Sequence, residues 1–541
     1  MEFNPTKCKL LASGRRPRAP PPFYVRGVPL QSVPHLRYLG LWIDSGLTWL
    51  EHIQRMSARA LDRLRVIRRG VGTMWGFHPR VVRRLIEATI FPVLFYAAPV
   101  WCSAVCHFTR LLPLDRVIWV CSIATLGLLR TTSHEAAMMS AGFLPAEFQL
   151  RRRVLDFHLR RLSFGDDLPA AAPPVITRSR TVGPMDILRL ELRHLRRHHP
   201  RLHSALPQIE TRTLWYAAPT STTWVPEPSI LSKTAAVARI RTERPLSSPD
   251  DLWLFTDGSV IGHRCGAAAV AFHGASLVPH TFAVSFEGFH SSTQAELVAL
   301  RLACRHLTDL GHFHRITLVT DSQPALLALT HVSGTSPLVM EVRRTLQLLR
   351  PRVADLRLWW TPSHVNLLEN DLADAAAQTA ALDPWPPLDL EAVPTCRTAL
   401  RGLLRQTFVQ RLDRQWALCD RGCDLFDIMP TFSTDLSWTD DLSRREVALV
   451  AQFLMGHYAS NAYLCRFGSR SDPCCDWCEA AMDDRQHRLF SCPRFTLIRQ
   501  RLSAVLEADS REGFTWTWTF LTGPGRRYLA HFLRSVQVAV H

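Results

Sequence analysis

The chain of 541 residues is poor in several features, and each shortage excludes a class of protein. Lysine occurs only at Lys7, Lys9 and Lys233, so arginine supplies almost all of the 64 basic side chains. Met1–Leu11 contain no apolar core of the kind that opens a secretory signal. Fourteen cysteines in so long a chain are too dilute for a secreted disulfide scaffold. We therefore expect an intracellular protein, nuclear or cytoplasmic, that is not secreted.

Long hydrophobic runs are also scarce. Residues 88–106 carry no charged side chain and approach the length of a membrane-spanning helix. Pro92 and Pro99 interrupt this stretch, and a proline inside a helix removes a backbone hydrogen bond. We therefore predict a buried helical hairpin here and no membrane as a partner, with a membrane-anchored protein as the less favoured alternative.

The net charge of +17 is distributed unevenly along the chain. Residues 1–250 carry 36 basic and 17 acidic side chains, a net of +19, and residues 251–380 carry 9 and 11, a net of −2. The rest of the chain carries 19 of each, so the whole excess lies in the first half. Such an excess favours a polyanionic partner, nucleic acid above all. The alternative is a generally basic, arginine-rich surface.

One helix of this basic half is predicted over residues 52–69. Its apolar residues recur at helical spacing, and Gly70 provides the stop. Arg55, Arg59 and Arg63 form a row along its other side. The row is a candidate nucleic-acid-binding surface laid along a phosphate backbone, and the alternative interpretation is an ordinary solvated face.

Composition divides the remaining sequence into segments of different texture. Residues 1–50 favour short strands and turns, with a buried strand expected over RYLGLWID (Arg37–Asp44). Residues 79–165 favour helices, and residues 166–248 favour an irregular basic linker, rich in proline and arginine, with one helix. Residues 395–460 again favour helices. The flanking regions are therefore predicted to be mainly α.

The central segment has a different pattern. Three apolar stretches predict consecutive strands, and a helix, a fourth strand, further helices, a fifth strand and a last helix follow. The predicted strands cover residues 252–260, 265–273, 275–284, 316–320 and 355–363. Two of the predicted helices cover residues 293–310 and 370–381. This order predicts the α/β class, with a five-stranded mixed sheet flanked by helices.

Four acidic residues in this segment are candidate catalytic and metal-binding groups: Asp257, Glu296, Asp321 and Asp374. Each has an ordinary structural explanation as well. Asp257 precedes a glycine, as in a turn, and Glu296 completes a Thr-x-x-Glu capping box. Asp321 has the position of a helix N-cap, and Asp374 that of a solvated helix residue.

Taken together, the four carboxylates indicate a shared site. We place Asp257 at the end of the first strand, Asp321 directly after the fourth and Glu296 in the first turn of a helix packed on the sheet. Carboxylates that converge repel one another unless a cation lies between them. Oxygen-only ligation suits Mg²⁺ or Mn²⁺, and a pair of such ions can clamp a phosphodiester for in-line attack by water.

The motifs that carry these residues resemble those of a type 1 ribonuclease H domain. In order they read FTDGS, CGAAAV, TQAELVALRLA, VTDSQPAL and WTPSHVNLLENDLADAAA. The resemblance implies two divalent ions bound by Asp257, Glu296, Asp321 and Asp374, with His364 helping product release or proton transfer. It also implies endonucleolytic cleavage of the RNA strand of RNA–DNA hybrids, leaving a 3′-hydroxyl and a 5′-phosphate.

The last of these motifs departs from the family pattern. The family commonly has Gly-Asn-Glu-x-Ala-Asp, whereas this chain has Glu369-Asn370-Asp371-Leu372-Ala373-Asp374. Asp371 replaces the longer glutamate, which puts an auxiliary role for this position in doubt.

A cluster near the C-terminus offers a different set of ligands. Cys475, Cys478, His487 and Cys492 follow the pattern Cys-x2-Cys-x8-His-x4-Cys, with Cys474 as an alternative first ligand. Three thiolates and one imidazole form a closed tetrahedral set for one structural Zn²⁺. Chance clustering of cysteines is the alternative. This spacing and the preceding LMGHYASNAYLCRFG resemble the C-terminal zinc-knuckle region of non-LTR retrotransposon polyproteins.

The N-terminal region resembles the end of a non-LTR reverse transcriptase. The stretches that carry the likeness are FNPTKCKLL, RYLGLWIDSGLTWLEHIQR and FPVLFYAAPVWC. By resemblance the YLG turn belongs to the primer grip and the arginine-bearing helix to the thumb. The aromatic-x-Asp-Asp turn of the polymerase would lie upstream of Met1, so we expect no DNA synthesis by this chain and a polymerase part of the same polyprotein as a partner.

These expectations combine into one domain plan and two functions. The plan begins with a truncated thumb-like region (residues 1–110), a helical connection (111–165) and the basic linker (166–248). A ribonuclease H domain (249–382), a helical linker (383–460), a zinc-knuckle-like segment (461–500) and terminal helices (501–541) follow. The main hypothesis is a metal-dependent ribonuclease H within a retrotransposon-derived fragment. The alternative is a catalytically inactive nucleic-acid-binding remnant of a retroelement.

Overall fold

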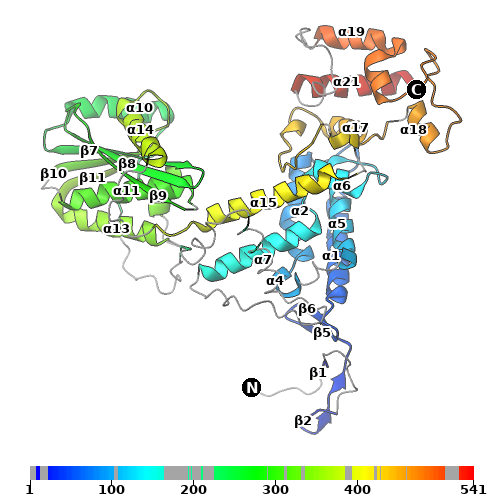
Figure 1. Ribbon diagram of the computed structural model, residues 1–541, viewed down its shortest axis with the longest axis horizontal. Coiled ribbons are helices and arrows are strands. Elements are labelled where there is room, and N and C mark those ends of the chain that lie inside the picture. Colours follow the sequence, from blue (N-terminus) through cyan, green and yellow to red (C-terminus); the bar gives the residue numbers. More distant parts are fainter. Residues whose placement is uncertain are drawn as a thin grey trace. The chain divides into compact units, whose positions relative to one another are not determined.

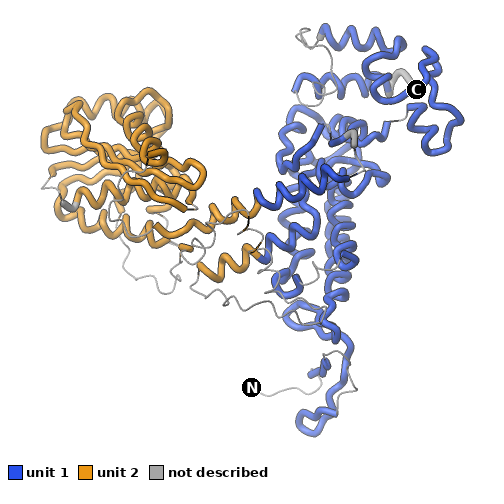
Figure 2. The backbone as a smooth tube through the Cα atoms, viewed as in Figure 1, with its two compact units in different colours: residues 1–154, 177–188, 406–541 blue, residues 155–176, 189–405 orange. Residues whose placement is uncertain are grey.

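The computed structural model of the chain divides into two compact units, shown in different colours in Figure 2. Unit 1 comprises residues 1–154, 177–188 and 406–541, and unit 2 comprises residues 155–176 and 189–405. The structure describes residues 8–12, 22–102, 108–163, 193, 197, 209–210, 225–288, 290–309, 313–330, 336–383, 393–419, 423–426, 428–458, 460–505 and 523–540. Most of the predicted basic linker, residues 166–248, lies outside the described residues.

Unit 2 is built on a five-stranded mixed sheet with the strand order β11-β10-β7-β8-β9. The strands are β7 (Asp251–Ile261), β8 (Arg264–His273), β9 (His280–Glu287), β10 (Phe313–Thr320) and β11 (Val353–Trp360). The first three form an antiparallel meander, β10 pairs with β7 in parallel, and β11 pairs with β10 in parallel. The prediction of a five-stranded mixed sheet flanked by helices is confirmed.

Helices cover both faces of this sheet, as Figure 1 shows. One face packs against α11 (Ser292–Asp309), α12 (Gln323–Thr330) and α13 (Pro337–Leu349). The other face packs against α10 (Lys233–Glu243) and α14 (Leu368–Leu382). Alternation along β7 explains the two layers, because successive strand residues point to opposite faces. Leu252 and Leu254 face the first set of helices, and Trp253 and Phe255 face the second.

Two glycines of the sheet allow helices to approach its backbone closely. A Cβ on Gly258 of β7 would lie 2.3 Å from the backbone of Ala295 and Glu296 in α11. A Cβ on Gly266 of β8 would lie 2.0 Å from the carbonyl oxygen of Ala377 in α14. Neither backbone contact can relax by a side-chain movement, so both positions require glycine. These contacts fix the depth at which α11 and α14 sit on the sheet.

Unit 1 is mainly helical, as predicted for the flanking regions. Its helices, two of which continue into unit 2, are α1 (Leu50–Ile67), α2 (Pro79–Thr89), α3 (Phe91–Leu94), α4 (Ala98–Trp101), α5 (Phe108–Leu126), α6 (His134–Ala141), α7 (Ala146–Leu162), α15 (Arg397–Ala417), α16 (Cys423–Phe426), α17 (Arg444–Leu454), α18 (Asn461–Arg466), α19 (Thr496–Val505) and α21 (Gly523–Val540). Short strand pairs precede them: β1 (Lys9–Leu10) with β4 (Gln31–Ser32), β2 (Tyr24–Val25) with β3 (Val28–Pro29), and β5 (His35–Tyr38) with β6 (Leu41–Asp44).

The stretch Arg37–Asp44 corrects one expectation. It does not form one buried strand. It contains the end of β5, the hairpin turn and the whole of β6, and Tyr38 and Leu39 are exposed. Leu39 and Gly40 both have positive φ, which is the backbone of a two-residue hairpin turn. Apolar composition suggested burial, but the turn geometry places these side chains at the tip of a hairpin.

The uncharged stretch that begins at residue 88 is divided among short helices. α2 ends at Thr89, and α3 and α4 follow, with Phe91, Leu94 and Trp101 buried. Among the residues that the structure describes, no helix is both long and apolar enough to cross a membrane.

Candidate active site and candidate zinc site

The parallel pairing of two strands brings Asp257 and Asp321 together. In the register of β7 and β10, Thr256 lies beside Thr320, so the residues that follow, Asp257 and Asp321, emerge side by side. The sequence suggested that Asp257 ends its strand, but β7 continues to Ile261. Beyond Thr256 this strand pairs with β8 alone. The site therefore forms where β10 ends, beside the middle of β7.

Glu296 reaches the same place from the start of α11. Its carboxylate lies with those of Asp257 and Asp321 in a group whose ligand atoms are all within 4.8 Å of one another. The close approach of α11 over Gly258 makes this possible. The structure therefore brings together three of the four predicted carboxylates around one point.

Other residues perform the ordinary structural roles that these carboxylates could have had. The Ser291 hydroxyl accepts a hydrogen bond from the backbone N–H of Gln294, in the first turn of α11, at 3.2 Å. The Ser322 hydroxyl caps α12 in the same way, accepting from Ala325 at 3.3 Å. The capping-box interpretation of Glu296 and the N-cap interpretation of Asp321 are therefore wrong. A turn at Asp257 is also wrong, because Asp257 and Gly258 lie within β7 and pair with β8. Both helix starts are satisfied without the site carboxylates.

Burial and mutual repulsion raise the pKa values of all three clustered carboxyl groups. Burial is the largest cause in each case. The pKa of Asp257 rises to about 7, with repulsion from Asp321 and Asp374 added, and that of Glu296 rises to about 10, with repulsion from Asp257 and Asp321. For Asp321 a hydrogen bond from Ser363 and the nearby His364 oppose the upward shift of the pKa. Groups held so close together favour protons or cations between them.

Asp374 and His364 lie at the margin of this cluster. Asp374 is half-buried on α14, outside the group of three, and its Oδ1 accepts a 2.7 Å hydrogen bond from Gln378. Its charge still contributes to the raised pKa values of Asp257 and Asp321. His364 is exposed in the loop after β11 and has a φ of 55°. The preceding residue, Ser363, hydrogen-bonds to Asp321, so the loop that carries His364 reaches the cluster.

Several supporting residues were not singled out from the sequence. The Thr320 hydroxyl donates to Glu296 at 3.5 Å, and the Trp360 indole donates to the backbone carbonyl of Asp321 at 2.9 Å. Ser363 and Gln378 hold Asp321 and Asp374. Thr320, Trp360 and Ser363 lie within the motifs, and Gln378 directly follows the last of them, but the sequence does not show which groups they contact.

The donor set of this cluster fits hard divalent cations. It consists of carboxylate oxygens alone, which is the chemistry that Mg²⁺ and Mn²⁺ prefer. The raised pKa values point the same way, because a cation would remove the repulsion that now favours protonation.

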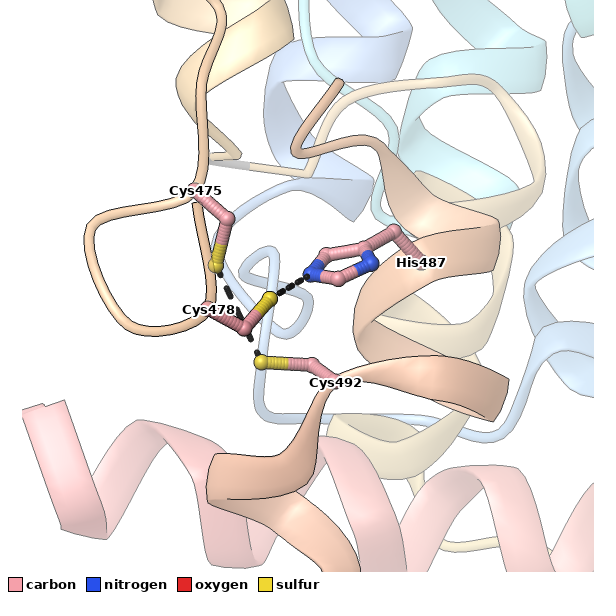
Figure 3. Close-up of side chains that lie close together, drawn as sticks. All are labelled: Cys475, Cys478, His487 and Cys492. Carbon is pink, nitrogen blue, oxygen red and sulfur yellow. Dashed lines mark hydrogen bonds between the residues drawn. The ribbon is translucent and has the colours of Figure 1, made fainter. Parts of the chain in front are cut away.

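The second predicted ligand set also converges, as Figure 3 shows. Cys475, Cys478, His487 and Cys492 each offer one ligand atom, and these atoms lie within 4.8 Å of one another. The Sγ atoms of Cys475 and Cys492 are 3.8 Å apart, and Sγ of Cys478 is 3.3 Å from Nε2 of His487. Cys474, the alternative first ligand, is exposed and outside the set.

These distances fit a tetrahedral zinc site. Zn–S bonds of about 2.3 Å at the tetrahedral angle place two sulfur atoms about 3.8 Å apart. The separation of Cys475 and Cys492 has this value. Burial and the neighbouring thiols raise the pKa of Cys492 to about 11, so a cation is needed for its thiolate to form at neutral pH.

The arginine row lies along the exposed side of α1. Arg55 donates to Glu51 at 2.5 Å and stacks on the Trp42 ring, and Arg63 donates to the carbonyl oxygen of Thr89. Arg59 and Arg63 line a groove of about 510 Å³ together with residues that include Arg37, Met56 and Tyr96. The row is therefore exposed and basic, as predicted, although two of its members also have partners within the chain.

Comparison with known proteins places the central domain in a family. Residues 249–382 match the ribonuclease H family. The chain is 31% identical over 149 residues to a retrovirus-related Pol polyprotein from type-1 retrotransposable element R1 4 of Nasonia vitripennis, covering 27% of this chain and 36% of that protein. It is 28% identical over 155 residues to a 115 kDa protein of the type-1 retrotransposable element R1DM of Drosophila melanogaster, covering 28% of this chain and 15% of that protein.

A solved structure is also similar. RNase H1 from the archaeon Halobacterium salinarum is 24% identical, with a TM-score of 0.21, over 24% of this chain and 96% of that one. The chain spans little more than a third of the first curated relative and less of the second. The chain thus contains a ribonuclease H family domain, residues 249–382, and is similar to the Pol polyproteins of R1 non-LTR retrotransposons.

Proposed function

We propose that the ribonuclease H domain is a metal-dependent endonuclease that hydrolyses the RNA strand of RNA–DNA hybrids. The observation that carries the proposal is the group of three carboxylates, Asp257, Glu296 and Asp321, within 4.8 Å at the end of β10. Asp374 completes the set from α14, close enough to repel two of them. Divalent ions held by these residues supply Lewis-acid stabilisation of the charge that develops on a phosphodiester during in-line attack by water.

The protein groups have separate tasks in this reaction. The carboxylates hold the cations, and Thr320 and Ser363 fix two of them by hydrogen bonds. In this proposal the exposed His364, which follows the Ser363 that hydrogen-bonds to Asp321, exchanges a proton with the product end and with solvent. Discrimination between the two strands rests on the 2′-hydroxyl, which the RNA strand alone carries.

The direct test uses the full chain and a hybrid whose RNA strand is labelled. With Mg²⁺ we expect cleavage of the RNA to products with a 5′-phosphate and a 3′-hydroxyl, and no cleavage of the matching DNA duplex. The Asp321→Asn variant serves as the inactive control. A folded, ion-binding chain that leaves the hybrid intact would exclude the proposal. Tight, salt-dependent binding without cleavage would then favour the nucleic-acid-binding remnant.

For the C-terminal cluster we propose one structural zinc ion, bound by Cys475, Cys478, His487 and Cys492. Support comes from the sulfur spacing and from the absence of an open position in a set of four protein ligands. Elemental analysis of the purified chain tests it, with an expected content of one zinc ion per chain.

For the arginine row we propose contacts with a nucleic-acid backbone. The support is the exposure of Arg55, Arg59 and Arg63 on one side of α1, within the basic half of the chain. Removal of one phosphate contact by Arg59→Gln would lower the slope of log affinity against log salt by about 0.9 for a duplex. An unchanged slope would favour the solvated-face interpretation.

A further inference from the structure

A short segment before the family-matching residues is built into the nuclease unit. Ser229 pairs with the edge strand β11, donating its N–H to Leu358 at 2.9 Å and accepting from the Trp360 N–H at 3.1 Å. α10 then packs on the sheet through the buried Ile240, and the turn η5 (Arg244–Leu246) leads into β7. The segment thus shares the face of the sheet that α14 covers (Figure 1).

Arg244 links this segment to the first turn of α14. Its guanidinium Nη1 lies 2.8 Å from Oε1 of Glu369, and both side chains are about nine-tenths buried or more. Nη2 donates to the carbonyl oxygen of Ser276 at 2.6 Å, and the guanidinium lies over the Phe272 ring. A buried pair with these additional contacts has a fixed geometry, unlike an ion pair at the surface.

Arg241 makes a second link, to the loop that carries His364. Its Nη2 donates to the carbonyl oxygen of Asn366 at 3.2 Å. His364 and Asn366 have φ values of 55° and 53°, in the left-handed region that residues other than glycine rarely adopt. Such a backbone persists only where its surroundings determine it. The α10 segment supplies one of those constraints.

We propose that Arg244 and Arg241 are positioning residues of the nuclease site. They fix the first turn of α14 and the preceding loop, and through these elements they place Asp374 and His364 relative to the three clustered carboxylates. Asp374 lies five residues beyond Glu369 on α14, so a helix start held in place also holds Asp374. This inference rests on the proposed function, because it gives the two arginines a role in that site.

The ion pair uses a residue at which this chain departs from the family pattern. Glu369 stands where the resembling family pattern commonly has glycine, and a glycine could not pair with Arg244. The link between α10 and α14 therefore depends on a residue type that the motif does not require.

The test compares Arg244→Met with a matched control, Arg343→Met, in the full chain. Arg343 is 5% exposed and donates from its guanidinium to the carbonyl oxygens of Leu329 and Ala328, in the last turn of α12 on the other face of the sheet. Both variants lose a buried guanidinium, but of the two arginines only Arg244 pairs with a residue of α14. We expect Arg244→Met to speed amide hydrogen exchange over residues 361–374 and to weaken Mg²⁺ binding by about 10- to 100-fold, as for other residues that orient metal ligands.

Kinetics add a second discriminating measurement. Arg244→Met should lower kcat at subsaturating Mg²⁺ while KM for the hybrid changes little, and Arg343→Met should lower stability without either local effect. Equal exchange over 361–374 and equal Mg²⁺ affinity in the two variants would overturn the proposal. If Arg244→Met does not fold, Glu369→Gln and the variant of the exposed Arg241, Arg241→Gln, are tested in the same way. Unchanged amide hydrogen exchange over residues 361–374 in both variants would then overturn the proposal.

The outcome is distinguishable from failure of the proposed function. Hydrogen exchange and Mg²⁺ titration need no cleavage, so they report on positioning even in a chain that does not cut hybrids. An unmodified chain without nuclease activity would remove the proposed function, whereas local exchange would decide the role of Arg244.

Discussion

The two candidate metal sites of this chain are assembled in opposite ways. Asp257 lies on β7, Asp321 directly follows β10 and Glu296 lies on α11, and they meet through sheet register and close helix packing. Cys475, Cys478, His487 and Cys492 lie within one short stretch of sequence and meet in a loop and short helical turns. The carboxylates repel one another and are held close by a packed sheet domain. The thiols and the imidazole are instead held close by the conformation of their own short segment.

Metal binding and folding depend on each other differently at the two sites. The sheet of unit 2 has an extensive apolar core of its own, so it can hold mutually repelling carboxylates in place without an ion. For the Cys/His segment the energy of zinc binding would itself be folding energy, as in other small zinc modules. We therefore expect Mg²⁺ to govern activity at the first site and Zn²⁺ to govern structure at the second.

The largest expected effect is on cleavage by Asp321→Asn. Loss of a ligand from the cation clamp should lower kcat by about three orders of magnitude or more, since metal-ion catalysis supplies several kcal/mol. The same variant should raise the stability of the Mg²⁺-free chain, because one repelling charge is removed. Hybrid cleavage and urea unfolding measure the two effects. A stability loss in the Mg²⁺-free chain would show that repulsion is not the main feature of the site.

The next largest effect concerns the zinc site. Cys478→Ser should abolish zinc binding and expose residues 460–505 to proteolysis, because about 10 kcal/mol or more of binding energy is lost. Cleavage of the hybrid should continue, since the proposed nuclease site has its own core. Cys474→Ser is the matched control and should retain one zinc ion per chain. Equal zinc loss in both variants would show that Cys474 is a ligand.

A pH dependence of intermediate size follows from the raised carboxyl pKa values. In the unfolded chain aspartate and glutamate lose their protons near pH ~4. In the folded, Mg²⁺-free chain Asp257 keeps its proton to about pH 7 and Glu296 to about pH 10. The folded state therefore binds more protons between these limits, and its stability falls as the pH rises above ~4.

Urea unfolding midpoints between pH 5 and 9, with and without Mg²⁺, check this expectation. Mg²⁺ should stabilise the chain more at high pH, where it replaces fewer protons. Glu296→Gln should flatten the decline. A stability that rises steadily over this range in the Mg²⁺-free chain would contradict the proposed electrostatics.

The smallest effect is expected from Asp371→Asn. Asp371 is exposed in the first turn of α14, where its charge interacts favourably with the helix N-terminus by about 0.3–1 kcal/mol. Hybrid cleavage should stay within about twofold of the parent chain at saturating Mg²⁺, and only the melting temperature should fall slightly. A tenfold loss of kcat would show that Asp371 takes the auxiliary role of the longer glutamate in the family pattern.

Local sequence patterns were sufficient to predict the elements of the nuclease domain. Apolar stretches predicted all five strands of the sheet, the helix that follows the third strand and the last helix, and the motifs identified the four acidic residues. These features depend on neighbours along the chain, which the sequence contains directly. The Cys/His ligand set was predictable for the same reason, because its spacing is local.

Tertiary structure alone decided which groups meet and what holds them. Only the β7–β10 register places Asp257 beside Asp321, and only the capping by Ser291 and Ser322 shows that the site carboxylates are not caps. The pair of Arg244 with Glu369 joins residues more than a hundred positions apart, with no local pattern to reveal it. Contacts of this kind depend on how strands pair and helices pack, so the sequence determined the chemistry available and the fold determined its geometry.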